Sequence, residues 1–149
     1  MKIEYTPIGI VHTPFKKLAD IPRQPSRGKG IRGTIELLPQ YRKGLKDLEG
    51  FSHIILLCHF HKVIEYNLDV IPPDRSKIRG LFATRTPRRP NPIGLSVVRL
   101  LEIQENMLQI SDLDILDGTP VLDIKPYFPP LMENEPVRTG WFESKDEEE

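Results

Sequence analysis

The sequence lacks most of the features that mark secreted, membrane and dinucleotide-binding proteins. Cys58 is the only cysteine among 149 residues, so no intrachain disulfide can form. The longest wholly apolar run is Ile54–Cys58 and the N-terminus has no apolar segment, so we expect neither a signal peptide nor a membrane span. No G-x-G-x-x-G follows an expected strand and opens a helix, and no Walker loop occurs, which disfavours a doubly wound α/β fold. These absences favour a small cytoplasmic protein in which Cys58 packs in the core and is not a nucleophile.

The formal net charge is zero, which by itself argues against a nucleic-acid partner, yet the charges are unevenly distributed. The last four residues, 146–149, are all acidic. Between Arg75 and Leu101 there are seven bases and no acid, and residues 16–32 carry six bases with one acid. Local patches decide what a surface attracts, so the sequence is compatible with a polyanionic partner.

Prolines and short alternating segments dominate the chain. The 15 prolines are dispersed, which suits short strands joined by stiff loops and disfavours long helices. Apolar alternation predicts strands over residues 8–12, 31–38, 51–63, 80–84, 93–103, 107–116 and 121–124, and one or two helical turns fit residues 41–50. We therefore expect an all-β, mostly antiparallel, compact β-barrel without a Rossmann sheet. It would be one domain over residues 1–143, followed by a disordered acidic tail over 144–149.

Two basic loops interrupt this pattern. A compact domain seldom keeps a loop as long as residues 13–30 without a functional reason. Residues 85–92 place Arg85, Arg88 and Arg89 beside three prolines, and guanidinium groups suit phosphate oxygens and stack on bases. Asn91 lies between two prolines, which restricts its backbone and directs its amide. Such stiffness favours a binding role over an ordinary solvated surface.

Aspartates and histidines supply groups that could carry chemistry. In one continuous strand Asp112 and Asp114 would share a face about 7 Å apart, as an acid/base pair, a cation site, a hydrogen-bonding ladder or a solvated strand face. His53, His59 and His61 would also share a strand face, and a strand H-x-H could hold a metal. No cysteine or Glu-x-x-His companion accompanies them, so hydrogen bonding at a sheet end is the favoured interpretation and we predict no metal site.

Several short motifs occur in order, and together they are specific. They are Pro22-Arg23-Gln24-Pro25, Phe51-Ser52-His53, Phe60-His61, Ala83-Thr84-Arg85, Arg89-Pro90-Asn91-Pro92-Ile93-Gly94, and a run with Leu113-Asp114, Asp117-Gly118-Thr119-Pro120-Val121 and Asp123-Ile124-Lys125-Pro126-Tyr127. From about Tyr5 to Tyr127 the chain resembles the TsaA-like, or TrmO, family. The resemblance implies a β-barrel that binds S-adenosylmethionine, usually as a homodimer with the cofactor near the subunit interface. It also implies methyl transfer to N6 of the threonylcarbamoyl-adenosine beside the anticodon of certain tRNAs.

The resemblance also implies which residues contact the cofactor. They are Gln24, Pro25, Ser26, Phe60, His61, Arg85, Leu95, Ser111, Asp112, Leu113 and Asp114. Phe60 and Leu95 offer apolar surface for the adenine, and the fork of Arg85 suits the methionine carboxylate. Asp112, Asp114 or His61 could take the proton that the acceptor nitrogen loses, and the threonyl carboxylate of the substrate could equally do so.

The resemblance places tRNA contacts less directly. Longer family members carry a further C-terminal domain thought to help hold tRNA, and this sequence ends in an acidic run instead. The contacts would then come from a second subunit or from Arg75, Lys77, Arg79, Arg88, Arg89 and Asn91. Two other functions stay open. A non-catalytic RNA-binding or regulatory module would use the same basic loop, and a metal-dependent hydrolase would use the histidines and aspartates.

Overall fold

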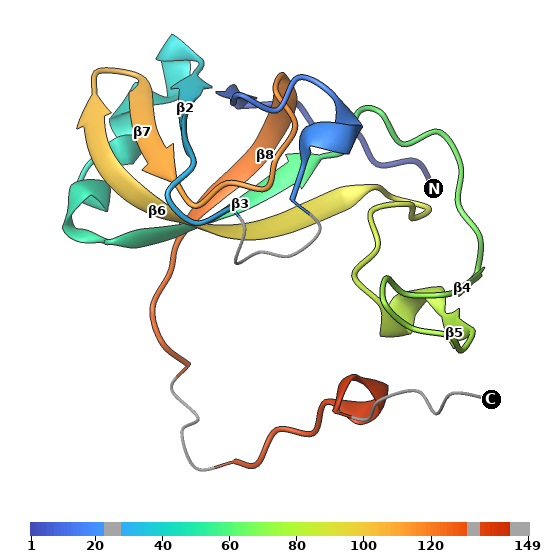
Figure 1. Cartoon of the computed structure of the whole chain (residues 1–149). Coiled ribbons are helices and arrows are strands. Elements are labelled where there is room, and N and C mark those ends of the chain that lie inside the picture. Colours follow the sequence, from blue (N-terminus) through green and yellow to red (C-terminus); the bar gives the residue numbers. More distant parts are fainter. Residues whose placement is uncertain (23–27, 131–134, 144–149) are drawn as a thin grey trace.

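Among residues 1–22, 28–130 and 135–143, which the computed structural model describes, six antiparallel strands form a closed barrel (Figure 1). They are β1 (Gly9–His12), β2 (Arg32–Leu37), β3 (His53–His59), β6 (Ile93–Gln104), β7 (Met107–Ser111) and β8 (Thr119–Pro126). They pair in the order β1-β2-β7-β6-β3-β8, and the pairing of β1 with β8 closes the barrel. The expected all-β, mostly antiparallel barrel is confirmed.

Alternation along the strands decides which side chains fill the barrel. On β3, Ile54, Leu56 and Cys58 are at most 2% exposed, while the residues between them lie nearer the surface. Val98 on β6 is the cross-strand partner of Ile54, Val121 on β8 is that of Cys58, and both valines are fully buried. Each such side chain contributes about 1.5–3 kcal/mol by leaving water, so the strand register is strongly specified.

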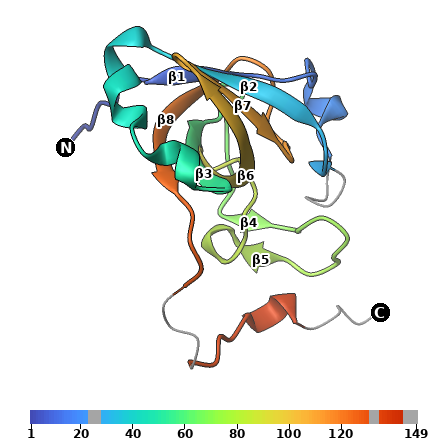
Figure 2. The same cartoon turned by 90° about the vertical axis from the view of Figure 1, so that its left-hand side faces the viewer.

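A two-stranded sheet lies beneath the barrel in both views (Figures 1 and 2). It pairs β4 (Asp69–Val70) with β5 (Arg79–Gly80) and leads into the 3-10 helix η5 (Leu81–Ala83). Beyond β8 the chain runs below the barrel, and the 3-10 helix η6 (Gly140–Phe142) contacts η5 through a hydrogen bond from Trp141. The other 3-10 helices in the described ranges are η1 (Leu18–Asp20), η3 (Pro39–Leu45) and η4 (Leu48–Gly50). None of the helices in these ranges is long and apolar enough to cross a membrane.

Three expected strands differ from the observed ones. The strand over residues 80–84 is wrong, because β5 ends at Gly80 and the Thr84 hydroxyl donates to the Leu81 carbonyl (2.7 Å), which closes a turn. The strand over 107–116 is too long, because Asp112 has a φ of +67° and the chain turns there. The strand over 51–63 ends at His59. The remaining strands lie within about two residues of their expected bounds, and the helical turns of residues 41–50 correspond to η3 and η4.

Candidate functional site

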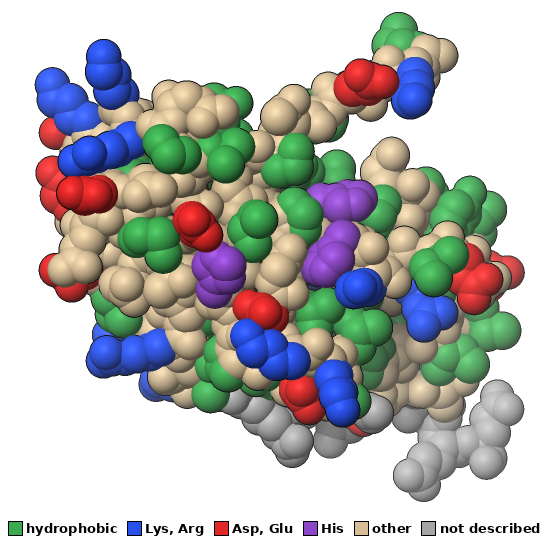
Figure 3. All heavy atoms as spheres, turned by 90° about the horizontal axis from the view of Figure 1, so that it is seen from above, with side chains coloured by type: hydrophobic (Ala, Val, Ile, Leu, Met, Phe, Trp, Pro, Cys, Tyr) green, Lys and Arg blue, Asp and Glu red, His purple; other side chains and the backbone are tan. Residues whose placement is uncertain are grey.

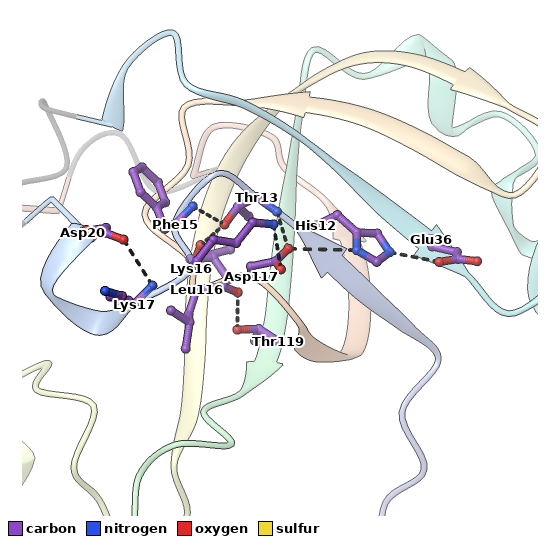
Figure 4. A network of polar contacts seen from close by, with 11 residues as sticks. His12, Thr13, Phe15, Lys16, Lys17, Asp20, Glu36, Leu116, Asp117 and Thr119 are labelled. Atoms are coloured by element: carbon purple, nitrogen blue, oxygen red, sulfur yellow. Dashed lines mark hydrogen bonds and ion pairs between the residues drawn. The ribbon is translucent and has the colours of Figure 1, made fainter.

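Residues 112–118 connect β7 to β8, and polar contacts fix this loop to the end of β1 (Figure 4). The N–H of Thr13 donates to Asp117 Oδ1 (2.9 Å), and the Thr13 hydroxyl donates to the Ile115 carbonyl (2.8 Å). Lys16 Nζ lies 2.9 Å from Asp117 Oδ2. Because Thr13 is buried, these bonds face little competition from water and hold the loop in one position.

The carboxylate of Asp117 is the centre of this network, and its pKa is lowered. The hydrogen bond from Lys16 is the largest cause and the backbone bond from Thr13 is the second. His12 adds a smaller electrostatic effect, with its Nδ1 4.0 Å from Asp117 Oδ1. The next residue, Gly118, has a φ of +81°, which glycine adopts without strain. Asp117 and Gly118 therefore position the loop that carries the candidate acids.

Asp112 and Asp114 occupy separate surroundings at the start of this loop. Asp112 Oδ1 accepts a hydrogen bond from the N–H of Gly30 (2.7 Å). Asp114 Oδ1 accepts one from the hydroxyl of Ser96 on β6 (3.3 Å). The expectation that the two aspartates share a strand face is wrong, because β7 ends at Ser111 and the left-handed backbone of Asp112 redirects the chain. Each of the two aspartates therefore has its own hydrogen-bond donor from a different segment.

Asp114 lies near the ends of β3 and β6, where an aromatic ring packs on a glycine. Cys58 on β3 pairs with Gly94 on β6, and a Cβ on Gly94 would lie 2.1 Å from Phe60 Cζ. The Phe60 N–H is held by the Pro92 carbonyl (2.8 Å). Burial and, second, the charge of Asp114 raise the pKa of the Cys58 thiol to about 12. The structure thus brings Phe60 and Asp114 to one end of the barrel, and the interpretation of Cys58 as core packing agrees with its burial.

His61 follows Phe60 at this end of the barrel. Its Nδ1 is buried and has no hydrogen-bond partner among the described residues. Burial is the largest cause that lowers its pKa, and the charges of Lys62 and His59 lower it further. The ring is therefore mainly neutral at pH 7 and able to accept a proton.

The other expected cofactor contacts have different surroundings where the structure describes them. Leu95 lies on the outer face of β6 and is 65% exposed, so it points away from Ser96 and the barrel interior. Arg85 is exposed on the loop after η5. Leu113 is buried, and its carbonyl oxygen would lie 2.4 Å from a Cβ on Gly28, so the chain at Gly28 packs directly on the 112–118 loop. Gln24, Pro25 and Ser26 lie outside the described residues.

A cavity of about 280 Å³ lies beside this loop and is rich in cations. Its lining residues are Lys29, Gly30, Arg32, Arg99, Leu101, Ser111 and Asp112. Arg32 on β2 and Arg99 on β6 are the two cross-strand partners of Ser111, so the register alone places two guanidinium groups around one hydroxyl. The sequence alone did not assign Lys29, Arg32 or Arg99 to a site. The signal exists only once the strand pairing is known.

The residues expected to contact tRNA have different surroundings. Arg75 and Arg79 pack against Trp141, with Cζ 5.3 Å and 5.4 Å from the ring centroid. Arg89 Nη1 donates to the carbonyls of Thr84 (2.9 Å) and Thr86 (3.1 Å), so this arginine holds its own loop. Lys77, Arg88 and Asn91 are exposed.

The histidines do not form a metal site with other side chains in the described part of the chain. In the described ranges no three His, Cys, Asp or Glu side chains could jointly hold a metal ion. His53 shares a short hydrogen bond with the Ser52 hydroxyl (2.7 Å) and meets the edge of Tyr127, at the opposite end of β3 from His59. Seen from above, histidine side chains lie beside apolar, acidic and basic ones (Figure 3). This arrangement offers a metal-dependent hydrolase no ligand set in these ranges.

Comparison with known proteins identifies a family and several relatives. The sequence profile of the tRNA-methyltransferase O N-terminal domain matches residues 10–131. A probable S-adenosyl-L-methionine-binding protein of Pyrococcus abyssi is 55% identical over 143 residues, covering 96% of this chain and 78% of that protein. The tRNA (adenine(37)-N6)-methyltransferase of Escherichia coli is 39% identical over 136 residues, covering 85% of this chain and 58% of that enzyme. A crystal structure of TrmO from Pseudomonas aeruginosa gives a TM-score of 0.79 at 40% identity, covering 99% of this chain and 66% of that one. The chain thus spans less than two thirds of that enzyme and of that solved structure.

Proposed function

The chain belongs to the tRNA-methyltransferase O N-terminal domain family, and from this premise we propose that it binds S-adenosylmethionine and methylates N6 of an adenine in tRNA. One observation carries the proposal: segments far apart in the sequence meet around residues 111–114. Gly28 packs on this loop, Ser96 bonds Asp114 within it, and Phe60 covers the glycine two residues before Ser96. Each of these segments contains or adjoins residues that the family resemblance assigns to the cofactor.

The residues at this end of the barrel suit a cationic, partly aromatic cofactor. When bound, S-adenosylmethionine supplies an electrophilic methyl group that passes to the acceptor nitrogen by in-line displacement. The half-buried carboxylate of Asp114 would stabilise a nearby positive charge more strongly than a carboxylate in open water. The ring of Phe60 provides a flat apolar surface for the adenine, and Arg85 provides a fork for the carboxylate.

His61 is the side chain best prepared to take the proton from the acceptor N6. Its pKa is lowered, so its free lone pair is available at neutral pH. As the N–CH₃ bond forms and the S–CH₃ bond breaks, the N6 proton would pass to His61. Asp112 has one oxygen engaged by Gly30, and Asp114 is needed beside the positive charge, so these two are the weaker candidates for the base.

The cationic cavity gives the acceptor a second point of attachment. Lys29, Arg32 and Arg99 lie beside Ser111 and Asp112, with one acid among the lining residues. An anionic group of the substrate would be held there, and a threonylcarbamoyl-adenosine carries such a group in its threonyl carboxylate. We therefore propose threonylcarbamoyl-adenosine beside the anticodon as the acceptor.

The outer face of β6 supports a homodimer with the cofactor near the subunit interface. Ile93, Leu95 and Val97 are 43%, 65% and 41% exposed, and they form an apolar row beside the half-buried Ile55 and Leu57 of β3. Leu95 faces away from Asp114 within one chain, so its expected cofactor contact requires a second copy. We also propose a cytoplasmic location, because Cys58 is a free thiol and the proposed substrate is tRNA.

Titration calorimetry with S-adenosylmethionine tests the cofactor site. We expect Arg85→Ala and Asp114→Asn to weaken binding by roughly tenfold or more, since each loses a charged contact of about 1.5–3 kcal/mol. Arg88→Ala and Asp123→Asn are matched controls outside the expected cofactor set, and they should bind as the wild type does. Leu95→Asp should yield monomers in light scattering and lose affinity as well. A wild type that gives no binding heat contradicts the proposal.

Mass spectrometry of tRNA nucleosides tests the reaction. Cells without the protein should lack one N6-methylated adenosine derivative, and the wild-type gene should restore it while His61→Asn should not. The competing RNA-binding module predicts an unchanged nucleoside profile and an RNA affinity that added cofactor does not alter.

A further inference from the structure

Near the β4–β5 sheet, two segments far apart in the sequence are joined by a pair of hydrogen bonds. The indole N–H of Trp141 donates to the carbonyl of Ala83 on η5 (2.8 Å). The guanidinium of Arg75 donates to the carbonyl of Phe142 (3.2 Å). The Trp141 bond holds η6 beside η5, and the Arg75 bond ties η6 to the segment before β5, so the exposed aromatic residues of both helices contribute to neighbouring parts of the molecular surface (Figure 1).

Arginines lie against every ring of this surface. Arg75 Cζ is 5.9 Å from the ring centroid of Phe142, and Arg89 Cζ is 5.8 Å from that of Phe82. Trp141 meets Phe142 edge to face, with centroids 6.0 Å apart at 71°. A guanidinium within about 6 Å of a ring is attracted to it and limits its rotation. We call this surface the aromatic platform; it consists of Arg75, Arg79, Phe82, Arg89, Trp141 and Phe142.

The two phenylalanines of the aromatic platform are far more exposed than apolar side chains usually are. Phe82 is 75% exposed and Phe142 is 69% exposed. The neighbouring Leu81 is 1% exposed and already anchors η5, so burial of Phe82 is not needed to hold this helix. A packing role therefore leaves the position of Phe82 unexplained, whereas a partner that stacks on flat rings accounts for it.

The charge around the aromatic platform selects the kind of partner. The segment from Arg75 to Arg89 carries six bases and no acid, and two of them, Lys77 and Arg88, are exposed close to the platform in sequence, with Glu65 4.0 Å from Arg88. Exposed rings within a basic surface are the arrangement that binds single-stranded nucleic acid, because bases stack on the rings while phosphates pair with the cations.

We propose that the aromatic platform stacks unpaired bases of the substrate RNA, with Phe82 and Phe142 as the stacking rings. The inference rests on the proposed function for the identity of the RNA. Stacking on a ring requires a base that is not in a helix, so the platform binds a loop and discriminates against a duplex. Arg75, Arg79 and Arg89 hold the rings in orientation, and phosphate contacts come from the exposed cations.

Fluorescence anisotropy with two labelled RNAs tests the platform: an anticodon stem-loop and a fully paired, blunt-ended duplex with the same number of nucleotides. Phe82→Ala and Phe142→Ala should each weaken binding of the stem-loop by roughly five- to a hundredfold, the range for loss of one stacked base. Binding of the paired duplex should change much less. Phe128→Ala is the matched control, since Phe128 is also exposed, at 59%, but lies outside the platform.

Conservative variants separate stacking from general loss of apolar surface. Phe82→Tyr should retain the affinity because it keeps a ring, whereas Phe82→Leu should lose it. Equal stem-loop affinity for the wild type and both alanine variants overturns the platform, as does an equal loss on the two RNAs. A change of dimer mass in Phe82→Ala or Phe142→Ala also overturns it, because the rings would then contact a second copy.

The calorimetry described above keeps the two proposals distinguishable. The alanine variants of the platform should bind S-adenosylmethionine as the wild type does. If the wild type methylates tRNA and the alanine variants do so with the same KM, only the platform is overturned. If the wild type binds neither RNA nor cofactor, the proposed function and the platform fail together.

Discussion

Gly94 lies beneath the ring of Phe60, and this contact can be tested by adding one methyl group. In Gly94→Ala the new Cβ would lie 2.1 Å from Phe60 Cζ and 2.7 and 2.8 Å from the two Cε atoms. Ordinary contact begins at 3.4 Å, so the ring must move by roughly 1.3 Å or leave its place. Because the Phe60 N–H is bound to the Pro92 carbonyl (2.8 Å), the ring can swing while its backbone is held.

Overpacking of this kind costs about 1–3 kcal/mol of the free energy of unfolding. Gly80→Ala is the control, because a Cβ on Gly80 has no atom within 4 Å and its φ of −63° suits alanine. Gly80→Ala should leave the free energy of unfolding unchanged, or raise it by about 0.4–1 kcal/mol because alanine lowers the conformational entropy of the unfolded chain. The two alanine variants should therefore differ by roughly 2 kcal/mol.

Urea denaturation of Gly94→Ala, Phe60→Ala and the double variant measures the contact directly. Removing the ring removes the clash, so the double variant should be no less stable than Phe60→Ala, with a coupling energy of about 1–3 kcal/mol. Gly94→Ala should also weaken S-adenosylmethionine binding by roughly tenfold, and Gly80→Ala should not. Additive stability changes, or equal stability of the two glycine variants, would show that the ring does not lie on Gly94.

Three further predictions concern titrating groups. Asp117→Ala should destabilise the protein by about 2 kcal/mol at pH 7. Because the pKa of Asp117 is lowered by folding, its contribution to stability is present above the unfolded pKa of 3.8 and disappears as the pH falls through the lower folded pKa. Urea titrations of the wild type and the variant at several pH values would show this loss. The Cys58 thiol, with a pKa of about 12, should react with a disulfide reagent at pH 8 only at the rate of unfolding, and fast reaction in the native state would contradict its burial. If His61 accepts the proton, the methylation rate should fall as pH drops through its lowered pKa, below 6.5, and His61→Asn should abolish that acidic limb.

The barrel itself could be predicted because its strands carry their own pattern. On β3 the alternation of Ile54, Leu56 and Cys58 places one face in the core, and the structure buries all three. Dispersed prolines ruled out long helices in the same way, since proline removes a backbone donor wherever it occurs. These local effects do not depend on which strand lies alongside, so they can be predicted from the sequence alone.

The expected site stays a prediction, and the structure bears only on which of its described residues lie near one another. The segment 111–114 is the centre of the candidate site, but the assumed strand face was wrong there. Leu113 and Ile115 alternate with polar residues as a strand would, and both are buried. The turn at Asp112 depends on its bond to Gly30, 82 residues away, which no window of sequence contains.

Composition and alternation thus decided the fold class and the core face of a strand such as β3, because both depend on residues a few positions apart. Strand pairing decided that Arg32 and Arg99 flank Ser111, and chain reversal decided that Trp141 binds Ala83, 58 residues away. The free energy of such contacts depends on partners that only the closed barrel brings together. Alternation predicts whether a side chain points into the barrel or out of it, whereas closure of the barrel decides which residues that side chain contacts.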